Sequence, residues 1–170
     1  MSEQKKGPSL KEDILKLIYK IVFILLLVFL FFTFIFGVAR IENLSMEPNI
    51  KNGDLIVFYR LDKNYVATNV AVIKYKGKVS ALRVVATGGD TVDIDQNGLI
   101  INGNHQTEPE AGKNTLAVKG GIDYPIRLKP GEVFLLGDNR EDSVDSRMFG
   151  PVKEKDTLGE LMTVIRRRNF

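Results

Sequence analysis

Hydrophobic positions are distributed very unevenly along this chain of 170 residues. Residues 21–39 carry no charge and are almost wholly apolar, whereas the rest of the chain alternates short apolar runs with polar turns. As a helix with a rise of about 1.5 Å per residue, this run spans roughly 28 Å, close to the hydrocarbon thickness of a bilayer. The pattern predicts one transmembrane helix over residues 21–39. The sequence Ser9-Leu10-Lys11-Glu12 predicts a capping box that starts the helix before the bilayer.

Charges at the two ends of the apolar run predict its orientation. Five lysines precede it: Lys5, Lys6, Lys11, Lys16 and Lys20. Arg40 and Glu42 follow it. By the positive-inside rule, residues 1–20 are a cytoplasmic segment and residues 40–170 an extracytoplasmic domain of a single-pass protein. A cleaved signal peptide is the alternative, with Gly37-Val38-Ala39 as the cleavage site, but the run is longer than the apolar segment of about 7–15 residues usual there.

After residue 40, the sequence predicts short strands separated by turns, and therefore a mostly β domain with its own core. The predicted strands are Leu55–Tyr59, Val70–Tyr75, Val79–Ala86, Thr91–Asp95 and Val133–Leu136. Asn97-Gly98 predicts a type I′ hairpin turn with both residues at its centre, because those positions need positive φ. Residues 103–125 predict a long surface excursion.

Charge and cysteine content narrow the possible functions. The net charge of +3 arises entirely within residues 1–40, so the predicted domain is neutral and a nucleic-acid partner is not expected. Arg166-Arg167-Arg168 predicts a solvated tail, with contact to anionic lipid headgroups as the second interpretation. The absence of cysteine excludes a disulfide framework and a thiol nucleophile. We expect no metal and no cofactor.

Ser45-Met46-Glu47-Pro48 begins six residues beyond the apolar run and is typical of a serine-protease nucleophile. A serine hydroxyl attacks a carbonyl usefully only when a neighbouring group accepts its proton. The one histidine, His105, lies in the predicted excursion, which disfavours a Ser-His-Asp triad. A Ser-Lys pair with a desolvated lysine is the other precedent.

These residues resemble those of type I signal peptidases, the membrane-anchored Ser-Lys serine proteases that remove signal peptides from exported preproteins. The matching blocks are Ser45-Met46-Glu47-Pro48, Asn52-Gly53-Asp54, Arg83-Val84-Val85, Gly89-Asp90, Gly137-Asp138-Asn139-Arg140, Ser143, Asp145-Ser146-Arg147 and Gly150. The resemblance implies a β-rich signal-peptidase-type catalytic domain at the outer face of a bacterial cell membrane, in contact with membrane lipid. It also implies exported preproteins as partners, bound by shallow pockets for small side chains before the cleaved bond.

The resemblance further implies roles around the serine. Ser45 matches the nucleophile, and its backbone N–H would serve the oxyanion hole. Asn43 stands where the family often has Ser or Gly, the Ser hydroxyl being a second oxyanion donor. Ser143 matches a hydroxyl that orients the amine of the general-base lysine. Asn49 replaces the Thr usual after the proline.

Three charged residues complete the matched set: Asp138, Asp145 and Arg147. The resemblance implies that they brace the site. A salt-bridge and turn-forming network that holds the loop after Leu136 is the equally weighted alternative.

Leu82 is the main departure, because it stands where the family has the general-base lysine. An alkyl side chain cannot accept a proton. Strand alternation puts Lys76 and Lys78 on the same face, but Lys78 lies roughly 13 Å away along a strand. A lysine side chain reaches only about half that distance. Rescue would require a shifted strand register.

Two hypotheses follow. The first is a protein that keeps the peptide groove without efficient catalysis. With Leu82 it resembles family members that lack dyad residues and are associated with assembly of surface pili in Gram-positive bacteria, and its partners would be pilin-like surface proteins. The alternative is an active signal peptidase with Ser45 as nucleophile and an unconventional base. A plain anchored β-domain without a groove is a third interpretation, which the density of matched residues disfavours.

Overall fold

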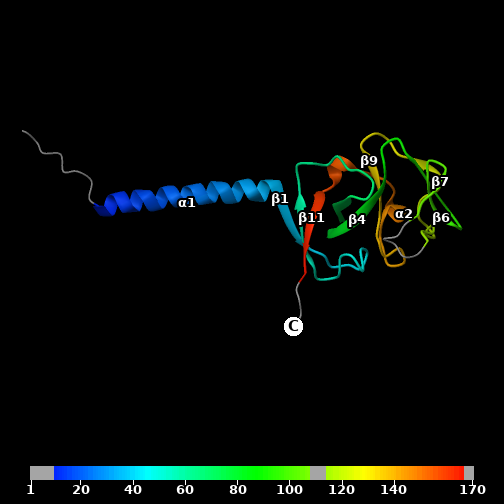
Figure 1. Ribbon diagram of the computed structural model, residues 1–170, viewed down its shortest axis with the longest axis horizontal. Coiled ribbons are helices and arrows are strands. Elements are labelled where there is room, and N and C mark those ends of the chain that lie inside the picture. The colour runs from blue at the N-terminus through cyan, green and yellow to red at the C-terminus, as the bar shows by residue number, and fades with distance from the viewer. Residues whose placement is uncertain (1–9, 108–113, 167–170) are drawn as a thin grey trace, which may run out of the picture. The chain divides into compact units, whose positions relative to one another are not determined.

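The computed structural model describes residues 10–107 and 114–166 (Figure 1). The chain divides into two compact units, residues 1–35 and 36–170. The first contains helix α1, Leu10–Ile35, which buries none of its residues. By length and composition, α1 is able to cross a membrane. Ser9, the first residue of the predicted capping box, lies outside the described residues.

The helix ends earlier than the apolar run. We predicted a helix to residue 39, but Phe36–Arg40 form strand β1, which pairs antiparallel with β2, Leu55–Tyr59. Within β1, Gly37 packs against the ring of Phe58, where an added Cβ would lie 2.2 Å from the ring. Apolar β-branched and aromatic residues suit a sheet as well as a lipid-facing helix, so hydropathy alone does not locate this boundary.

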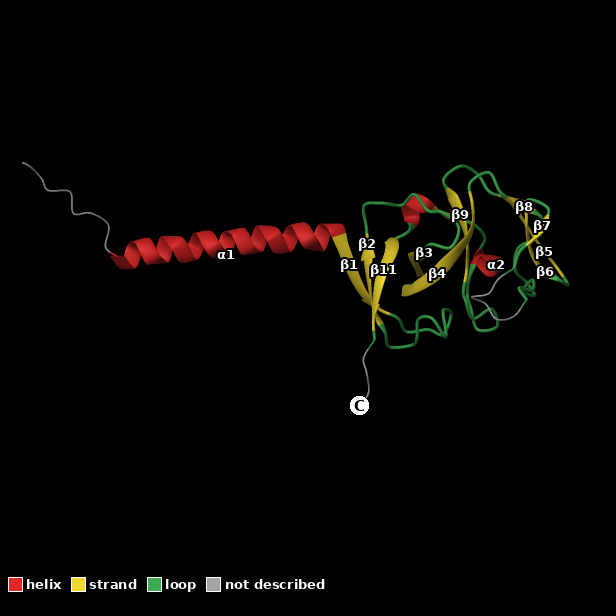
Figure 2. Ribbon diagram, viewed as in Figure 1, coloured by secondary structure: helices red, strands yellow, loops and turns green. Residues whose placement is uncertain are grey.

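The described residues of the second unit form two antiparallel sheets (Figure 2). The larger sheet has seven strands in the order β1, β2, β11 (Gly159–Ile165), β3 (Val70–Tyr75), β4 (Lys78–Thr87), β9 (Glu132–Leu136) and β10 (Val152–Lys153). The smaller sheet has four strands in the order β7 (Asn104–His105), β6 (Gly98–Ile101), β5 (Thr91–Asp95) and β8 (Ile126–Arg127). Helix α2 (Ser146–Phe149) and the 3₁₀ helix η1 (Glu154–Asp156) lie in the connections. The predicted mostly β fold with an N-terminal helix is confirmed.

Strand β4 contributes side chains to all three hydrophobic clusters of the second unit. Ala81 lies in the first cluster, with residues of β2. Leu82 and Val84 lie in the second, which also contains residues of β3 and β9. Ala86 lies in the third, with Phe134 of β9 and residues of the smaller sheet. Because alternate side chains of a strand point to opposite faces, one long strand supports the core on both sides.

Each of the predicted strands is confirmed, with ends that differ by at most one residue from β2, β3, β4, β5 and β9. The predicted type I′ turn is wrong. Asp95 pairs with Gly98, so Gln96 and Asn97 form the loop, and of the two predicted central residues only Gly98 has positive φ. Asp95 Oδ1 accepts hydrogen bonds from the N–H groups of Asn97 and Gly98 at 2.7 and 3.1 Å. This side-chain turn replaces the backbone turn that the sequence suggested.

The predicted excursion over residues 103–125 is only partly a surface loop. Its beginning forms β7, which pairs with β6. Thr115 is fully buried. Residues 108–113 lie outside the described residues.

Gly159 allows β11 to approach β2 closely. Its φ is 148°, and an added Cβ would lie 2.0 Å from the carbonyl oxygen of Tyr59. We expect Gly159→Ala to lower the free energy of unfolding by about 3 kcal/mol, since the strained φ and the forced displacement of β2 each add a cost. Urea unfolding of the full chain in detergent micelles measures this loss.

Gly77→Ala is the matched control for this substitution. Gly77 also has positive φ, at 84°, but an added Cβ there meets nothing within 4 Å. It should therefore show only the conformational cost of about 1 kcal/mol. Equal losses in the two variants would contradict the steric explanation.

Candidate active site

Ser45 lies in the loop between β1 and β2 and is only 4% exposed. Its neighbour Met46 is buried in the first hydrophobic cluster, which fixes the loop against the sheet. Backbone hydrogen bonds close the loop on itself, from Ile50 N to Met46 O and from Gly53 N to the oxygen of Ile41, each at 2.8 Å. The serine is therefore held on a short, well-anchored segment.

The segment after β9 lies directly against Ser45. The backbone N–H of Asn139 donates to Ser45 O at 2.9 Å, and its side-chain amide donates to Leu44 O at 3.2 Å. An added Cβ at Gly137 would lie 2.2 Å from Ser143 Oγ and 2.4 Å from Ser45 O. Only glycine at this position permits so close an approach of the two segments.

The structure places Leu82 on the same face as this contact. The β4–β9 register, continued by one residue beyond its last pair, sets Leu82 opposite Gly137. Residues directly opposite one another in an antiparallel pair point to the same face of the sheet. Leu82 therefore points toward the face where Gly137 meets Ser45 and Ser143, and it is fully buried in the second cluster.

Ser143 carries an unsatisfied polar group at this place. Its side chain is largely buried, and among the described residues its Oγ has no hydrogen-bond partner. Leaving a buried hydroxyl unpaired costs about 1–3 kcal/mol. The family resemblance predicts that this hydroxyl orients the amine of a lysine. The alkyl side chain at position 82 offers it neither a donor nor an acceptor.

Asn43 lies beside Ser45 with both ends of its side-chain amide hydrogen-bonded. Its Oδ1 accepts a hydrogen bond from Ser45 N at 3.1 Å, while its Nδ2 donates to Ser80 Oγ at 3.1 Å and to Val79 O at 3.4 Å. Because a backbone N–H can only donate, the amide atom that faces Ser45 is the oxygen. The Ser45 N–H predicted for an oxyanion hole and the amide nitrogen of Asn43 are thus both engaged within the protein.

A buried ion pair joins β4 to the segment after β9. Arg83 donates from Nε to Asp138 Oδ1 at 2.8 Å and from a terminal nitrogen to Oδ2 at 2.7 Å. The side chain of Asp138 is fully buried, and that of Arg83 is 16% exposed. Asn49 Nδ2 also donates to Asp138 Oδ2 at 2.7 Å, so the pair extends to the serine loop.

Asp145 and Arg147 form a second buried pair. Arg147 donates to both carboxylate oxygens of Asp145 at 2.9 Å and to the oxygen of Arg140 at 2.6 Å. Asp145 also accepts from Gly137 N at 3.1 Å and caps α2. Burial raises the pKa of the nearby Tyr124 to about 12, and the charge of Asp145 adds to the rise. The contacts are those of the predicted bracing network; a direct catalytic role of its residues stays a prediction.

The remaining candidate residues lie apart from Ser45 or bind other groups. His105 is on β7, with its Nε2 3.6 Å from Asp95 Oδ2. Lys78 is exposed at the start of β4, and the β3–β4 register runs without a shift from Lys78 to Arg83. Arg166, predicted as part of a solvated tail, instead donates to Asn49 O at 3.0 Å and to Asp54 at 3.2 Å. Arg167 and Arg168 lie outside the described residues.

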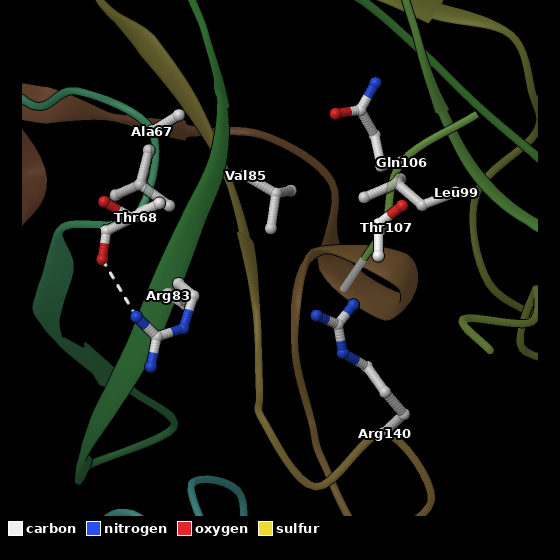
Figure 3. Close-up of a pocket in the computed structure, with 9 residues that line it drawn as sticks. Ala67, Thr68, Arg83, Val85, Leu99, Gln106, Thr107 and Arg140 are labelled. Carbon is white, nitrogen blue, oxygen red and sulfur yellow. Dashed lines mark hydrogen bonds between the residues drawn. The ribbon is translucent and has the colours of Figure 1, made fainter. Parts of the chain in front are cut away.

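A separate pocket has Arg83 in its lining (Figure 3). It is lined by Arg83 and Arg140 from opposite sides, with Val85 and Leu99 among the apolar lining residues, and Ser45 does not line it. Arg83 also donates to Thr68 O at 3.0 Å there. Within residues 10–107 and 114–166, no group of three or more His, Cys, Asp or Glu side chains is placed to hold a metal ion.

The structure combines an apolar N-terminal helix with a β-rich domain in which a buried serine lies on an anchored loop. This combination is that of a membrane-anchored serine-hydrolase-like protein. The chain belongs to the signal peptidase family, peptidase S26, whose model matches residues 14–165. This confirms the family predicted from the sequence. Together with the apolar helix α1, membership of the family fits a membrane-anchored protein.

Known relatives cover most of the chain. Signal peptidase I of Bacillus licheniformis is 26% identical over 168 residues, 92% of this chain and 90% of the relative. Signal peptidase IB of Staphylococcus aureus (strain COL) is 29% identical over 170 residues, 89% of each chain. Signal peptidase I P of Bacillus subtilis subsp. natto is 30% identical over 148 residues, 81% of this chain and 80% of the relative. The solved signal peptidase I of Enterococcus faecalis V583 is 25% identical, with a TM-score of 0.48, covering 59% of this chain and 97% of that one.

The Arg83–Asp138 pair generates a prediction about stability. We expect Asp138→Asn to lower the free energy of unfolding by about 3–5 kcal/mol, because a guanidinium that is mostly buried then loses its charged partner. Thermal unfolding of the full chain in detergent micelles measures the change. Arg166→Gln is the control, since its pair with Asp54 is 47% exposed on the arginine side and should contribute at most about 1 kcal/mol. Losses of equal size would contradict this ranking.

Proposed function

We propose that this protein is a signal-peptidase-like membrane protein that binds exported chains beside Ser45 and is impaired in cleaving them. One observation carries the proposal. The side chain at the position of the family's general base, Leu82, is an alkyl group buried in an apolar cluster on the face shared with Ser45 and Ser143. Without a proton acceptor at this place, Ser45 is a weak nucleophile.

The geometry of β4 supports binding of an extended chain. β3 pairs with β4 from Lys78 to Arg83, but β9 pairs with β4 only from Arg83 onward. Among the described residues, the β9-side edge of Lys78–Leu82 therefore has no partner strand. An unpaired strand edge binds an extended peptide through main-chain hydrogen bonds. This edge lies next to the serine loop, since Asn43 reaches Ser80.

The lysines near position 82 do not provide a substitute base. Lys78 is exposed at the beginning of β4, four residues from Leu82 along an unshifted strand. The Nζ of Lys76 lies 5.3 Å from the centre of the Tyr75 ring, in the turn before β4. These positions support impaired catalysis over an active enzyme with an unconventional base.

The proposed partners are exported preproteins or pilin-like surface proteins, which the protein would bind at the extracytoplasmic face of the cell membrane. The five lysines before the apolar run of residues 21–39 support an N-terminus in the cytoplasm and a second unit outside it. Exposed apolar residues on β1, β2 and β11 support contact of this unit with lipid. These residues are Val38, Leu55, Met162 and Ile165, which are 66%, 41%, 58% and 53% exposed.

Restoring the base tests this proposal. Purified full-length protein in detergent should cleave a preprotein with a small-x-small site slowly or not at all. Leu82→Lys should raise the cleavage rate at least about 100-fold, because general-base catalysis typically contributes 10²–10⁴-fold. The readout is the amount of mature protein formed over time. Cleavage by the unaltered protein as fast as by Leu82→Lys would refute impaired catalysis.

Two control variants make the comparison specific. Leu61→Lys adds the same charge at a residue that is 52% exposed, and it should leave the rate unchanged. Ser45→Ala combined with Leu82→Lys should abolish the gain, since cleavage then lacks its nucleophile. A gain that survives loss of Ser45 would show that another group performs the reaction.

A cellular experiment tests the role without cleavage. Cells that carry Ser45→Ala in place of the unaltered protein should assemble their surface proteins normally, because binding at the β4 edge does not use the hydroxyl. Surface display of pilin-like proteins, measured by immunoblotting of cell-wall fractions, is the readout. A phenotype equal to that of a deletion strain would instead indicate an active peptidase.

A further inference from the structure

We propose that the side chain of Asn43 is a built-in plug that occupies the binding edge and the serine N–H until an incoming chain displaces it. This inference rests on the binding function proposed above and concerns the regulation of the same site. The plug is a second obstacle to catalysis, separate from Leu82. Asn43 acts through the groups around it and is therefore a positioning residue.

The backbone directions of β4 identify which edge Asn43 covers. Val84 N donates to Asn69 O at 2.8 Å, and Val84 O accepts from Thr68 N at 2.9 Å, so the polar groups of Val84 point toward the β3 side. In an antiparallel sheet, successive residues point their backbone groups to alternate sides. Val79 and Ala81 lie five and three residues before Val84, an odd number in each case. Their backbone N–H and C=O groups therefore point to the unpaired edge.

Asn43 reaches this unpaired edge with its amide. Nδ2 lies 3.4 Å from Val79 O and 3.1 Å from Ser80 Oγ. At the same time, Oδ1 accepts from Ser45 N at 3.1 Å. One side-chain amide thus presents a donor to the edge and an acceptor to the serine, the same pair of groups that a peptide bond presents.

An incoming peptide needs both groups that Asn43 occupies. A strand added to the β4 edge needs a donor aimed at Val79 O, because this carbonyl is the acceptor on that side. A carbonyl attacked by Ser45 needs the Ser45 N–H for its developing negative charge. The single hydrogen of Ser45 N–H is already donated to Asn43 Oδ1, and the Asn43 amide nitrogen lies against Val79 O at the edge, so a chain that uses both groups has to displace the amide.

The plug is able to move without unfolding the site. Asn43 is only partly buried and lies two residues from Ser45, so rotation of its own side chain breaks the three contacts. The loop keeps its other anchors, which are the buried Met46 and the bond between Asn139 N and Ser45 O. Displacement therefore removes hydrogen bonds but leaves the hydrophobic contacts intact.

Peptide binding tests the plug without any need for cleavage. The probe is a fluorescein-labelled synthetic signal peptide with alanines at its small-x-small positions, titrated by anisotropy into the full-length protein in detergent micelles. Asn43→Gly should bind it at least about three times more tightly than the unaltered protein. Asn104→Gly, an exposed asparagine on β7, is the matched control and should bind like the unaltered protein. Melting temperatures identify a variant that fails to fold. If Asn43→Gly fails to fold, Asn43→Ser is used in its place.

Kinetics in the Leu82→Lys background test the effect on Ser45 N–H. Adding Asn43→Gly should raise kcat at least tenfold, since a single oxyanion donor contributes about 10²–10³ in kcat. Asn43→Asp keeps an oxygen for the serine N–H and should leave kcat at or below the level of Leu82→Lys alone. A purely structural role of Asn43 would lower kcat and the melting temperature in both variants.

The outcomes separate this inference from the proposed function. If the unaltered protein binds the peptide while Asn43→Gly binds no more tightly and gains no kcat, the plug is wrong and the binding function stands. If none of the variants binds the peptide, the binding function fails, and the plug fails with it.

Discussion

The buried Arg83–Asp138 ion pair is the interaction on which the arrangement of the site depends. It connects β4 to the segment after β9, and Asn49 extends it to the serine loop. Two charges removed from water are stable only when their remaining hydrogen-bonding capacity is also satisfied. In the observed arrangement, Arg83 and Asn49 satisfy both carboxylate oxygens of Asp138, and Gly137 lets the segments close together. The pair thus fixes where Ser45 lies with respect to β4.

This framework does not depend on the chemistry that it positions in related proteins. Asp138 accepts hydrogen bonds from the side chains of Arg83 and Asn49. Asp145 and Arg147 bond to one another and to backbone groups. An alkyl side chain at position 82 is therefore compatible with an intact serine loop and its anchors. The side chain of Leu82 stabilises the fold, because it is buried in the second hydrophobic cluster. The buried Ser143 hydroxyl has no hydrogen-bond partner among the described residues.

The strands and the family were accessible from the sequence because they depend on local patterns. Short runs of β-branched and aromatic residues predict β2, β3 and β5 with their ends. Strand β1 was missed because Phe36 to Ala39 continue an apolar run that is indistinguishable from a membrane helix by composition. β11 was missed because its residues gain their partners from β2 and β3, far away along the chain. The hairpin at Asp95 was misassigned because a side-chain hydrogen bond decided the turn.

The sequence by itself determined the membrane-helix candidate, the mostly β fold, the family and the identity of the residue at each matched position. These features can be predicted from composition, from the alternation of apolar and polar residues and from the order of short motifs. Only the tertiary structure decided what those positions contact. It placed Leu82 opposite Gly137, left Ser143 Oγ without a partner among the described residues, and turned the Asn43 amide between Ser45 and β4. Contacts such as that between Asn43 and Ser80 join residues tens of positions apart and depend on how the strands and loops pack, which no local pattern specifies.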